Sequence, residues 1–227
     1  MRWACDGFGG LMRVQGVLLG LILGISLVFI AQLFGDWDEA WEVNPGAVVE
    51  SWHRLREGSA GSGDAHHFLT LLSCAFLHGD VFHLTGNMAY LWGFGALVSE
   101  LLGWRWMLGV FLLSALGASV SHVIIERDSW IPMLGASGAI SGLMGAYLDM
   151  ALRWDLPDPH IWPLAEPVAP WKLAALAAVF FAMDYHSMFT RTAGNIAVGA
   201  HVGGFTVGLV LAALVVPMPR VARHRRT

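Results

Sequence analysis

The chain has 227 residues, of which 56% are hydrophobic and 13% charged, whereas a soluble domain has about 25% charged residues. The net charge of −4 is spread along the chain and the two cysteines lie far apart, which argues against nucleic-acid binding and against a disulfide framework. The length fits one domain. Apolar stretches long enough to be membrane-spanning helices cover residues 14–34, 76–98, 106–125, 137–152, 171–189 and 196–216.

A long polar loop, residues 35–75, separates the first two spans. Its first half is acidic and contains Trp37, Trp41 and Trp52, residues typical of a membrane interface. The GSAGSG stretch at 58–63 predicts a flexible connector. The fourth span, 137–152, is short for a full crossing. We expect its first residues to line a cavity, because irregular backbone at membrane depth is tolerated there.

Six spans place both termini on one side of the membrane, and the distribution of basic residues predicts which side. Cytoplasmic termini give the inside Arg2, Arg13, Arg105, Arg153, Lys172, Arg220, Arg223, Arg225 and Arg226, and the outside only Arg54, Arg56, Arg127 and Arg191. The sequence therefore predicts a multi-pass protein of the cell (inner) membrane. It would have a cytoplasmic N-terminus (1–13), a six-helix membrane domain (14–216) and a basic cytoplasmic tail (217–227) that can also bind anionic lipid headgroups.

Four polar residues lie inside predicted spans: His83 and Asn87 in the second, Ser137 in the fourth and His201 in the sixth. Polar groups at membrane depth are unfavourable, and they usually face a bundle interior or a water-filled cavity and mark a functional site. A serine and a histidine buried together, with further hydrogen-bond donors, are typical of a serine hydrolase.

Ser137 lies in the sequence Gly-Ala-Ser-Gly, residues 135–138. Small neighbours leave its hydroxyl unobstructed, and a serine that begins a helix has a backbone N–H free of helical partners. Taken alone, however, this tetrapeptide is more typical of a small-residue face for helix packing.

His201 lies in a stretch in which small residues repeat at helical spacing, Gly199 with Gly203 and Gly204 with Gly208. Such faces let two helices pack closely enough for a serine and a histidine to touch. The span contains no acidic residue near His201, so we expect a Ser–His dyad rather than a triad. The alternative is a packing histidine bonded to a neighbouring carbonyl.

His83 and Asn87 are four residues apart and project from one helical face, where both could donate hydrogen bonds to a developing oxyanion. His78 precedes them at the mouth of the helix. The alternatives are interhelical polar contacts, or a metal site formed by His78, His83, His122 and His201. The sequence has no HExxH motif and no carboxylate at ligand spacing beside these histidines, so we expect no metal and no cofactor.

Three segments resemble motifs of the rhomboid intramembrane serine proteases: 77–88 (LHGDVFHLTGNM), 135–142 (GASGAISG) and 200–208 (AHVGGFTVG). They occur in the order found in that family, and the likeness extends from about residue 71 to residue 216. The resemblance implies an all-α, polytopic bundle of six transmembrane helices with a water-filled cavity that opens outward. Its substrates would be other membrane proteins with unstable helices.

The resemblance also implies residue roles. Ser137 would be the nucleophile and His201 the general base. His83, Asn87 and the N–H of Ser137 would stabilise the oxyanion. The supporting residues would be His78, Gly135, Gly138 and Gly204.

Two positions differ from the family pattern. Many members have a Trp-Arg pair shortly before the second span, where this chain has Leu69 and Thr70. Some members place an aromatic residue four positions after the nucleophile, stacked on the catalytic histidine, where this chain has Ser141. We therefore expect other packing to hold His201, from Phe205 or from an aromatic residue of a neighbouring helix.

Two other functions remain as alternatives. A non-catalytic rhomboid-like scaffold would bind membrane proteins without cutting them, although inactive relatives characteristically lack the serine or the histidine. A small transporter or metal channel would need paired discontinuous segments or an intramembrane carboxylate relay. The carboxylate that best fits such a relay, Asp149, falls near the inner end of its span. The sequence gives no oligomeric state.

Overall fold

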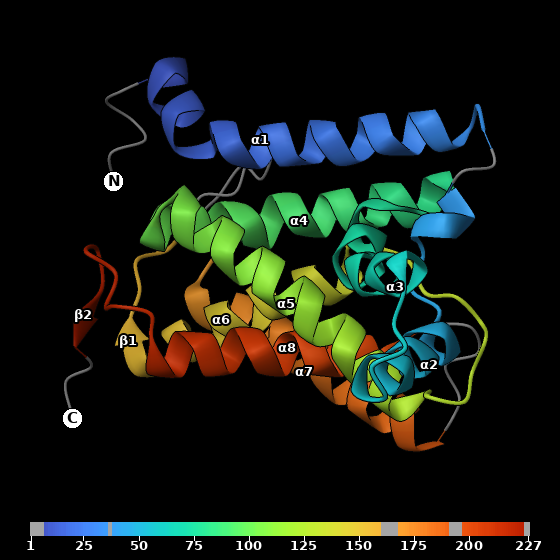
Figure 1. The fold of residues 1–227 in the computed structure, drawn as a ribbon. Helices are drawn as coiled ribbons and strands as arrows, with labels where there is room; N and C mark the ends of the chain where they lie inside the picture. The colour runs from blue at the N-terminus through green and yellow to red at the C-terminus, as the bar shows by residue number, and fades with distance from the viewer. Residues whose placement is uncertain (1–6, 36–37, 160–167, 191–196, 225–227) are drawn as a thin grey trace.

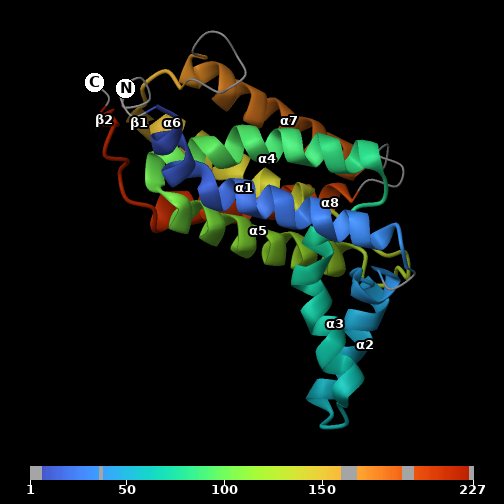
Figure 2. The ribbon, with the colours of Figure 1, turned by 90° about the horizontal axis from the view of Figure 1, so that it is seen from above.

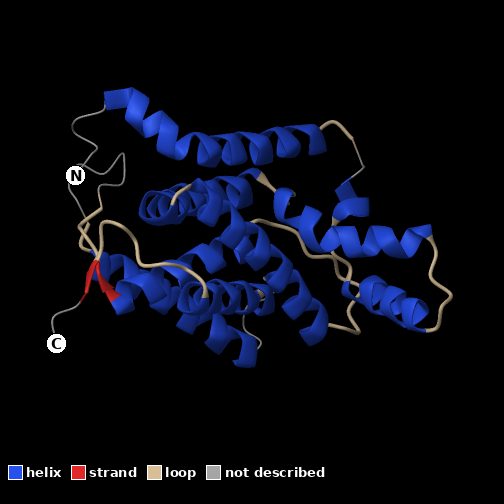
Figure 3. Cartoon of the chain, turned by 60° about the vertical axis from the view of Figure 1, so that its left-hand side comes forward, coloured by secondary structure: helices blue, strands red, loops and turns tan. Residues whose placement is uncertain are grey.

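A computed structural model of the chain describes residues 7–35, 38–159, 168–190 and 197–224. The regular secondary structure of this part of the chain is helical apart from one pair of two-residue strands (Figure 1, Figure 3). The α-helices are α1 Gly7–Gln32, α2 Pro45–Arg56, α3 Ser62–Ser73, α4 Val81–Leu102, α5 Trp104–Ile125, α6 Ser137–Arg153, α7 Pro170–Thr190 and α8 Val198–Leu214. Short 3-10 helices span Asp38–Trp41 and Cys74–Phe76, and β1 (Trp154–Asp155) pairs antiparallel with β2 (Arg223–His224).

A helix forms over each of the six apolar stretches predicted from the sequence. Three helices among the described residues are long and apolar enough to cross a membrane: α1, α5 and α7. The segment Ser62–Phe76 and α4 pass the same test together, with a bend of 79° between them. The helix α8 is apolar but shorter, and the predicted start of its span, residue 196, lies outside the described residues. Three or four spans are thus supported, and the count of six stays a prediction.

The helix α6 is the centre of the bundle and contacts α4, α5, α7 and α8. Of its 17 residues, 12 are buried, so most of its surface is covered by other helices. Because α6 is surrounded by other helices, it needs no lipid-facing surface of full membrane length. Its first residues line a cavity, as expected from its shortness.

Most of the predicted polar loop is folded into a helical hairpin, α2 and α3, which projects from the bundle (Figure 2). Pro45 begins α2, and the side chain of Asn44 caps it by accepting a hydrogen bond from the N–H of Ala47 (3.2 Å). Gly58 has a φ of +72° in the turn between the two helices, a conformation that favours glycine. The sequence predicts only a polar loop with a connector at 58–63, and the structure forms two helices that this connector joins. Trp37 lies outside the described residues.

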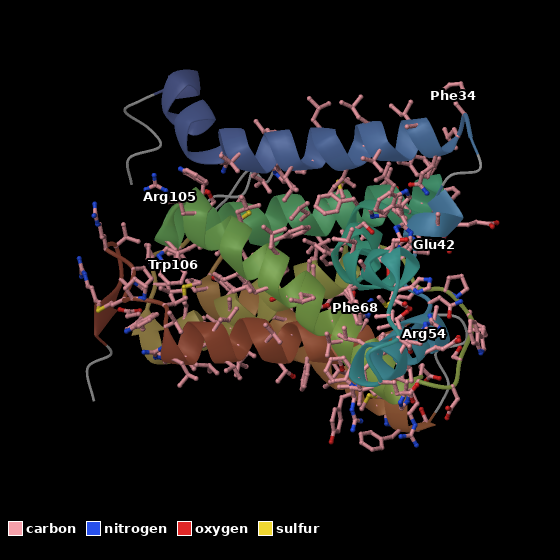
Figure 4. All side chains as sticks on the ribbon, viewed as in Figure 1. Phe34, Glu42, Arg54, Phe68, Arg105 and Trp106 are labelled. Atoms are coloured by element: carbon pink, nitrogen blue, oxygen red, sulfur yellow. The ribbon has the colours of Figure 1, made fainter. Side chains whose placement is uncertain are left out.

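Among the described residues, basic side chains assigned to the cytoplasmic side gather at one end of the bundle. In Figure 4, Arg105 and Trp106 lie at the end opposite to Phe34, Glu42, Arg54 and Phe68. Other described basic residues of this group flank the end of α6, the start of α7 and the segment after α8. Arg2, Arg191, Arg225 and Arg226 lie outside the described residues.

Candidate active site

Ser137 is the first residue of α6, and the segment before it is fixed to the hairpin side of the molecule. Met133 exchanges two backbone hydrogen bonds with Val43, of 2.8 and 3.0 Å. The N–H of Gly135 donates to the carbonyl of Cys74 (2.9 Å). Because Ser137 opens the helix, its own N–H belongs to the first-turn donors that lack an acceptor within the helix.

The structure brings Ser137 and His201 together. The hydroxyl oxygen of Ser137 lies 2.8 Å from Nε2 of His201. The two helices meet through glycine: a Cβ added to Gly204 would overlap the carbonyl oxygen of Gly138, and one added to Gly208 would overlap that of Gly142. Backbone contact between α6 and α8 thus sets the distance between serine and histidine, as the small-residue spacing predicts.

The other ring nitrogen of His201 also has a partner. Its Nδ1 lies 3.1 Å from Oδ2 of Asp184 on α7. The expectation that no carboxylate would reach His201 is therefore wrong. That expectation was based only on the acidic residues in the span of His201, whereas the carboxylate of Asp184 comes from a neighbouring helix.

Aromatic packing does not hold the His201 ring in the way expected. Phe205, one turn further along α8, stacks on Phe181 of α7 with ring centroids 4.4 Å apart. Among the described residues, none of the ring contacts involves His201. The ring is contacted instead by the carboxylate of Asp184 at Nδ1.

His83 faces the start of α6. A Cβ added to Gly135, where φ is +122°, would lie 2.8 Å from Nε2 of His83 and 3.8 Å from the hydroxyl of Ser137. Glycine at this position therefore leaves room for the imidazole, and the ring and the hydroxyl border one space. The Nδ1 of His83 accepts from the N–H of Gly79 (3.4 Å), so the neutral ring has its proton on Nε2 and can donate into that space.

Asn87 lies one turn after His83 and is buried. One N–H of its side-chain amide donates to the carbonyl of His83 (2.9 Å). An amide nitrogen has two hydrogens, so a second donor remains. Asn87, His83 and Ser137 all line the same cavity.

His78 supports His83 rather than the cavity itself. Its ring is 1% exposed and packs edge-on against His83, with centroids 5.1 Å apart. The side chain of Gln32 holds the backbone of His78 through both N–H (3.1 Å) and carbonyl (3.3 Å). Loss of this ring would leave His83 without its packing partner.

The cavity has a volume of about 800 Å³ and is lined by residues of α4, α5, α6, α7 and α8. His122 and Glu126 of α5 also line it. Within the described residues, no group of three or more histidines, cysteines or acidic side chains is placed to hold a metal ion. His78, His83, His122 and His201 thus do not form the metal cluster considered from the sequence.

Asp184 is the site residue that sequence reasoning missed. The signal was present, because Asp184 is an acidic residue inside the apolar stretch 171–189, and intramembrane carboxylates indicate functional sites. Asp149, the carboxylate considered from the sequence, instead pairs with Arg153 at 3.1 Å. A single sequence does not show that α7 places its acidic residue against α8.

The chain is similar to known proteins over most of its length. A family model described as the Rhomboid domain matches residues 65–218. The chain is 27% identical over 212 residues to RHOMBOID-like protein 12, mitochondrial, of Arabidopsis thaliana, covering 86% of this chain and 57% of that protein. It is 25% identical over 168 residues to Rhomboid protein 1, mitochondrial, of Saccharomyces cerevisiae, covering 70% and 45%.

A third relative is Presenilin-associated rhomboid-like protein, mitochondrial, of Bos taurus, 29% identical over 143 residues. The match covers 62% of this chain and 31% of the bovine protein. The chain thus spans less than two thirds of the length of each of these relatives. Because the domain model matches well over half of the chain, the chain belongs to the rhomboid family of polytopic membrane proteins.

Proposed function

We propose that this protein is an intramembrane serine protease that cleaves peptide bonds in or near the transmembrane segments of other membrane proteins. The observation that carries the proposal is the 2.8 Å contact between the Ser137 hydroxyl and Nε2 of His201 at the wall of the cavity. A nucleophile within hydrogen-bond reach of a base is the arrangement that covalent catalysis requires. The family typically consists of such proteases.

In this proposal Ser137 attacks the carbonyl carbon of the scissile bond while its proton passes to Nε2 of His201. Collapse of the tetrahedral intermediate breaks the C–N bond, and His201 gives the proton to the leaving amine. Water then hydrolyses the ester on Ser137 by the same steps. The chemistry needs no cofactor.

The oxyanion of the intermediate would be stabilised by Nε2 of His83, the second amide hydrogen of Asn87 and the N–H of Ser137. His83 and Asn87 border the cavity together with Ser137, and His83 borders the space beside Gly135. Loss of one such donor in a serine protease typically lowers turnover about a hundredfold or more.

The partners would be membrane lipids and membrane-protein substrates with unstable helices. We further propose that α1, α4, α5, α6, α7 and α8 are six spans and that both termini are cytoplasmic, because described basic residues assigned to the inside gather at one end. A cell membrane is the first candidate location. The printed names of three relatives make a mitochondrial membrane the second candidate.

The decisive experiment compares wild type with Ser137→Ala in liposomes, using a single-span test substrate and a fluorophosphonate probe. We expect cleavage and labelling of wild type and neither in the variant, with Ser141→Ala as the matched control that keeps both. Cleavage by wild type and Ser137→Ala alike would overturn the proposal. If a panel of substrates and the probe were left untouched by both proteins, the non-catalytic scaffold would be the better interpretation.

A further inference from the structure

We propose that Asp184 is a positioning residue that sets the orientation and proton arrangement of His201, so that the site works as a Ser–His–Asp triad. The inference rests on the proposed protease function and adds a residue from a third helix to it. Three contiguous groups carry it: the Ser137 hydroxyl, the His201 ring and the Asp184 carboxylate.

The two contacts of the His201 ring are made by opposite nitrogens. Nε2 lies 2.8 Å from the Ser137 hydroxyl and Nδ1 lies 3.1 Å from Oδ2 of Asp184. An ionised carboxylate can only accept, so Nδ1 must carry the proton of the neutral imidazole. Nε2 is then the free acceptor that faces Ser137, which is the tautomer that a general base requires.

The same contact favours the next state of the reaction. When Nε2 takes the serine proton, the ring becomes a cation, and the adjacent carboxylate stabilises it. Both side chains are largely buried, with 17% exposure for His201 and 24% for Asp184, so water screens the pair only in part.

A second contact between α7 and α8 keeps the carboxylate in place. Phe181 lies three residues before Asp184, and Phe205 lies four residues after His201, so each pair shares a helical face. The stack of Phe181 on Phe205 (4.4 Å) therefore lies one turn from the Asp184–His201 contact. The aromatic stack and the Asp184–His201 contact therefore join α7 to α8 in two successive helical turns. The carboxylate restrains the imidazole of His201, to which Ser141 offers no aromatic partner.

The charged and titratable groups around His201 come from several helices. His83 of α4 and His122 and Glu126 of α5 line the cavity with His201, and Asp184 comes from α7. Among the described residues, Asp184 is the acidic side chain bonded to the ring. A pH profile of an Asp184 variant therefore reports chiefly on this contact.

The test measures kcat, KM and the pH profile of kcat/KM for the full chain in phosphatidylcholine–phosphatidylglycerol liposomes with a single-span substrate. It compares wild type with Asp184→Asn, Asp184→Glu and Asp128→Asn. The Asp128 side chain is 95% exposed and near Arg127, and it does not line the cavity, so Asp128→Asn removes the same charge without changing the cavity wall. Thermal unfolding of each variant separates loss of fold from loss of positioning.

We expect Asp184→Asn to lower kcat about 10- to 100-fold with KM within about twofold; removal of the buried triad aspartate of a soluble protease lowers kcat about 10⁴-fold. The acidic limb of the profile should move to lower pH, because the imidazolium loses its anionic partner. Asp184→Glu should have a kcat and an acidic limb that lie between those of Asp184→Asn and wild type. Asp128→Asn should match wild type.

The proposal is overturned if Asp184→Asn matches Asp128→Asn in kcat and in the acidic limb. It is equally overturned if kcat falls but the limb stays in place and Asp184→Glu recovers nothing, since the role would then be packing alone. If Asp184→Asn unfolds at a clearly lower temperature than wild type, Asp184→Glu decides the question. The proposal then requires that Asp184→Glu has a kcat below that of wild type and an acidic limb moved part of the way to lower pH.

Nitrogen-15 NMR of labelled histidine provides a readout that does not depend on proteolysis, with His201 assigned by loss of its signals in His201→Gln. Wild type should show protonated Nδ1 and unprotonated Nε2 at alkaline pH, and Asp184→Asn should show a mixture of tautomers. An unchanged tautomer in the variant would overturn the proposal. The expected tautomers in a wild-type protein that neither cleaves nor labels would instead overturn the protease function alone.

Discussion

The helix α8 contacts α5, α6 and α7, and it meets two of these neighbours, α6 and α7, by different means. Against α6 the contact is between backbones, because Gly204 and Gly208 admit the carbonyls of Gly138 and Gly142. Against α7 the contact is between side chains: the Phe181–Phe205 stack and the Asp184–His201 pair. His201 lies where the two interfaces meet.

The difference separates two properties of the candidate site. A glycine interface has a closest approach fixed by backbone atoms, so the Ser137–His201 distance has little freedom. A side-chain interface depends on rotamers, and the second half of α7 is loosely covered, with Met183 and Phe189 exposed. We therefore expect changes at the first interface to affect fold and chemistry together, and changes at the second to affect mainly the rate.

The largest effect is expected from Gly208→Ala. The added Cβ would overlap the carbonyl oxygen of Gly142, and backbone on the other side cannot rotate away. Overpacking typically destabilises by about 1–3 kcal/mol, and we expect the upper part of that range, with cleavage lost because α8 moves away from Ser137. Thermal unfolding in detergent and the cleavage assay would measure both.

The matched control for this change is Gly109→Ala on α5, where an added Cβ meets no heavy atom within 4 Å. Alanine is also the better helix former, so stability and cleavage should be unchanged or slightly improved. If Gly208→Ala behaved like Gly109→Ala, backbone contact would not be what sets the distance between α6 and α8.

A middle-sized effect is expected from Phe181→Ala. This change removes the stack on Phe205 but leaves both backbones and Ser137 in place, so kcat should fall about three- to tenfold; an aromatic pair contributes about 0.5–1.5 kcal/mol beyond its buried area. Because the stack positions Asp184, the double variant Phe181→Ala/Asp184→Asn should lose less than the product of the two single losses.

Phe189→Ala is the control for this prediction, since Phe189 is 68% exposed and its described ring contact is with Tyr185 of the same helix. It should leave kcat within about twofold of wild type. Losses that multiply fully in the double variant would show that the stack and the carboxylate act independently.

The two interfaces also differ in how well a single sequence predicts them. The glycines facing α6 repeat at helical spacing beside His201, so the pattern is local and indicates close packing. Asp184 and Phe181 carry no such pattern, because their partners lie on another helix and the register between α7 and α8 is not encoded by spacing. The pairing of Ser137 with His201 could therefore be expected, whereas the pairing of Asp184 with His201 could not.

The hairpin of α2 and α3 was not predicted, for a related reason. Its helices α2 and α3 have 12 residues each, and helices this short depend on caps and tertiary contacts for their stability. Asn44 and Pro45 are recognisable start signals for α2. The hydrogen bond from Arg54 to Asp64 (2.7 Å), which joins the two helices, is visible only in three dimensions.

The smallest effect on catalysis is expected at this hairpin, which lies apart from both interfaces. The hydrogen bond from Arg54, followed by that from the N–H of Gly61, holds the pKa of Asp64 well below its usual range. A carboxyl whose pKa is lowered on folding stabilises the folded state above its unfolded pKa of about 3.9 and less as the pH falls below it. Protection of α2 and α3 amides from hydrogen exchange should thus be constant from neutral pH to about pH 5 and decline below about pH 4.

Asp64→Asn should lower that protection at neutral pH and remove its decline in acid, while cleavage at neutral pH stays within about twofold of wild type. Glu57→Gln, at the exposed end of α2, serves as the control and should keep the wild-type profile. A decline in acid that persists in Asp64→Asn would assign the stabilisation of the hairpin to other carboxylates. A large loss of cleavage would instead mean that the hairpin positions the segment before Ser137, to which Val43 is bonded through Met133.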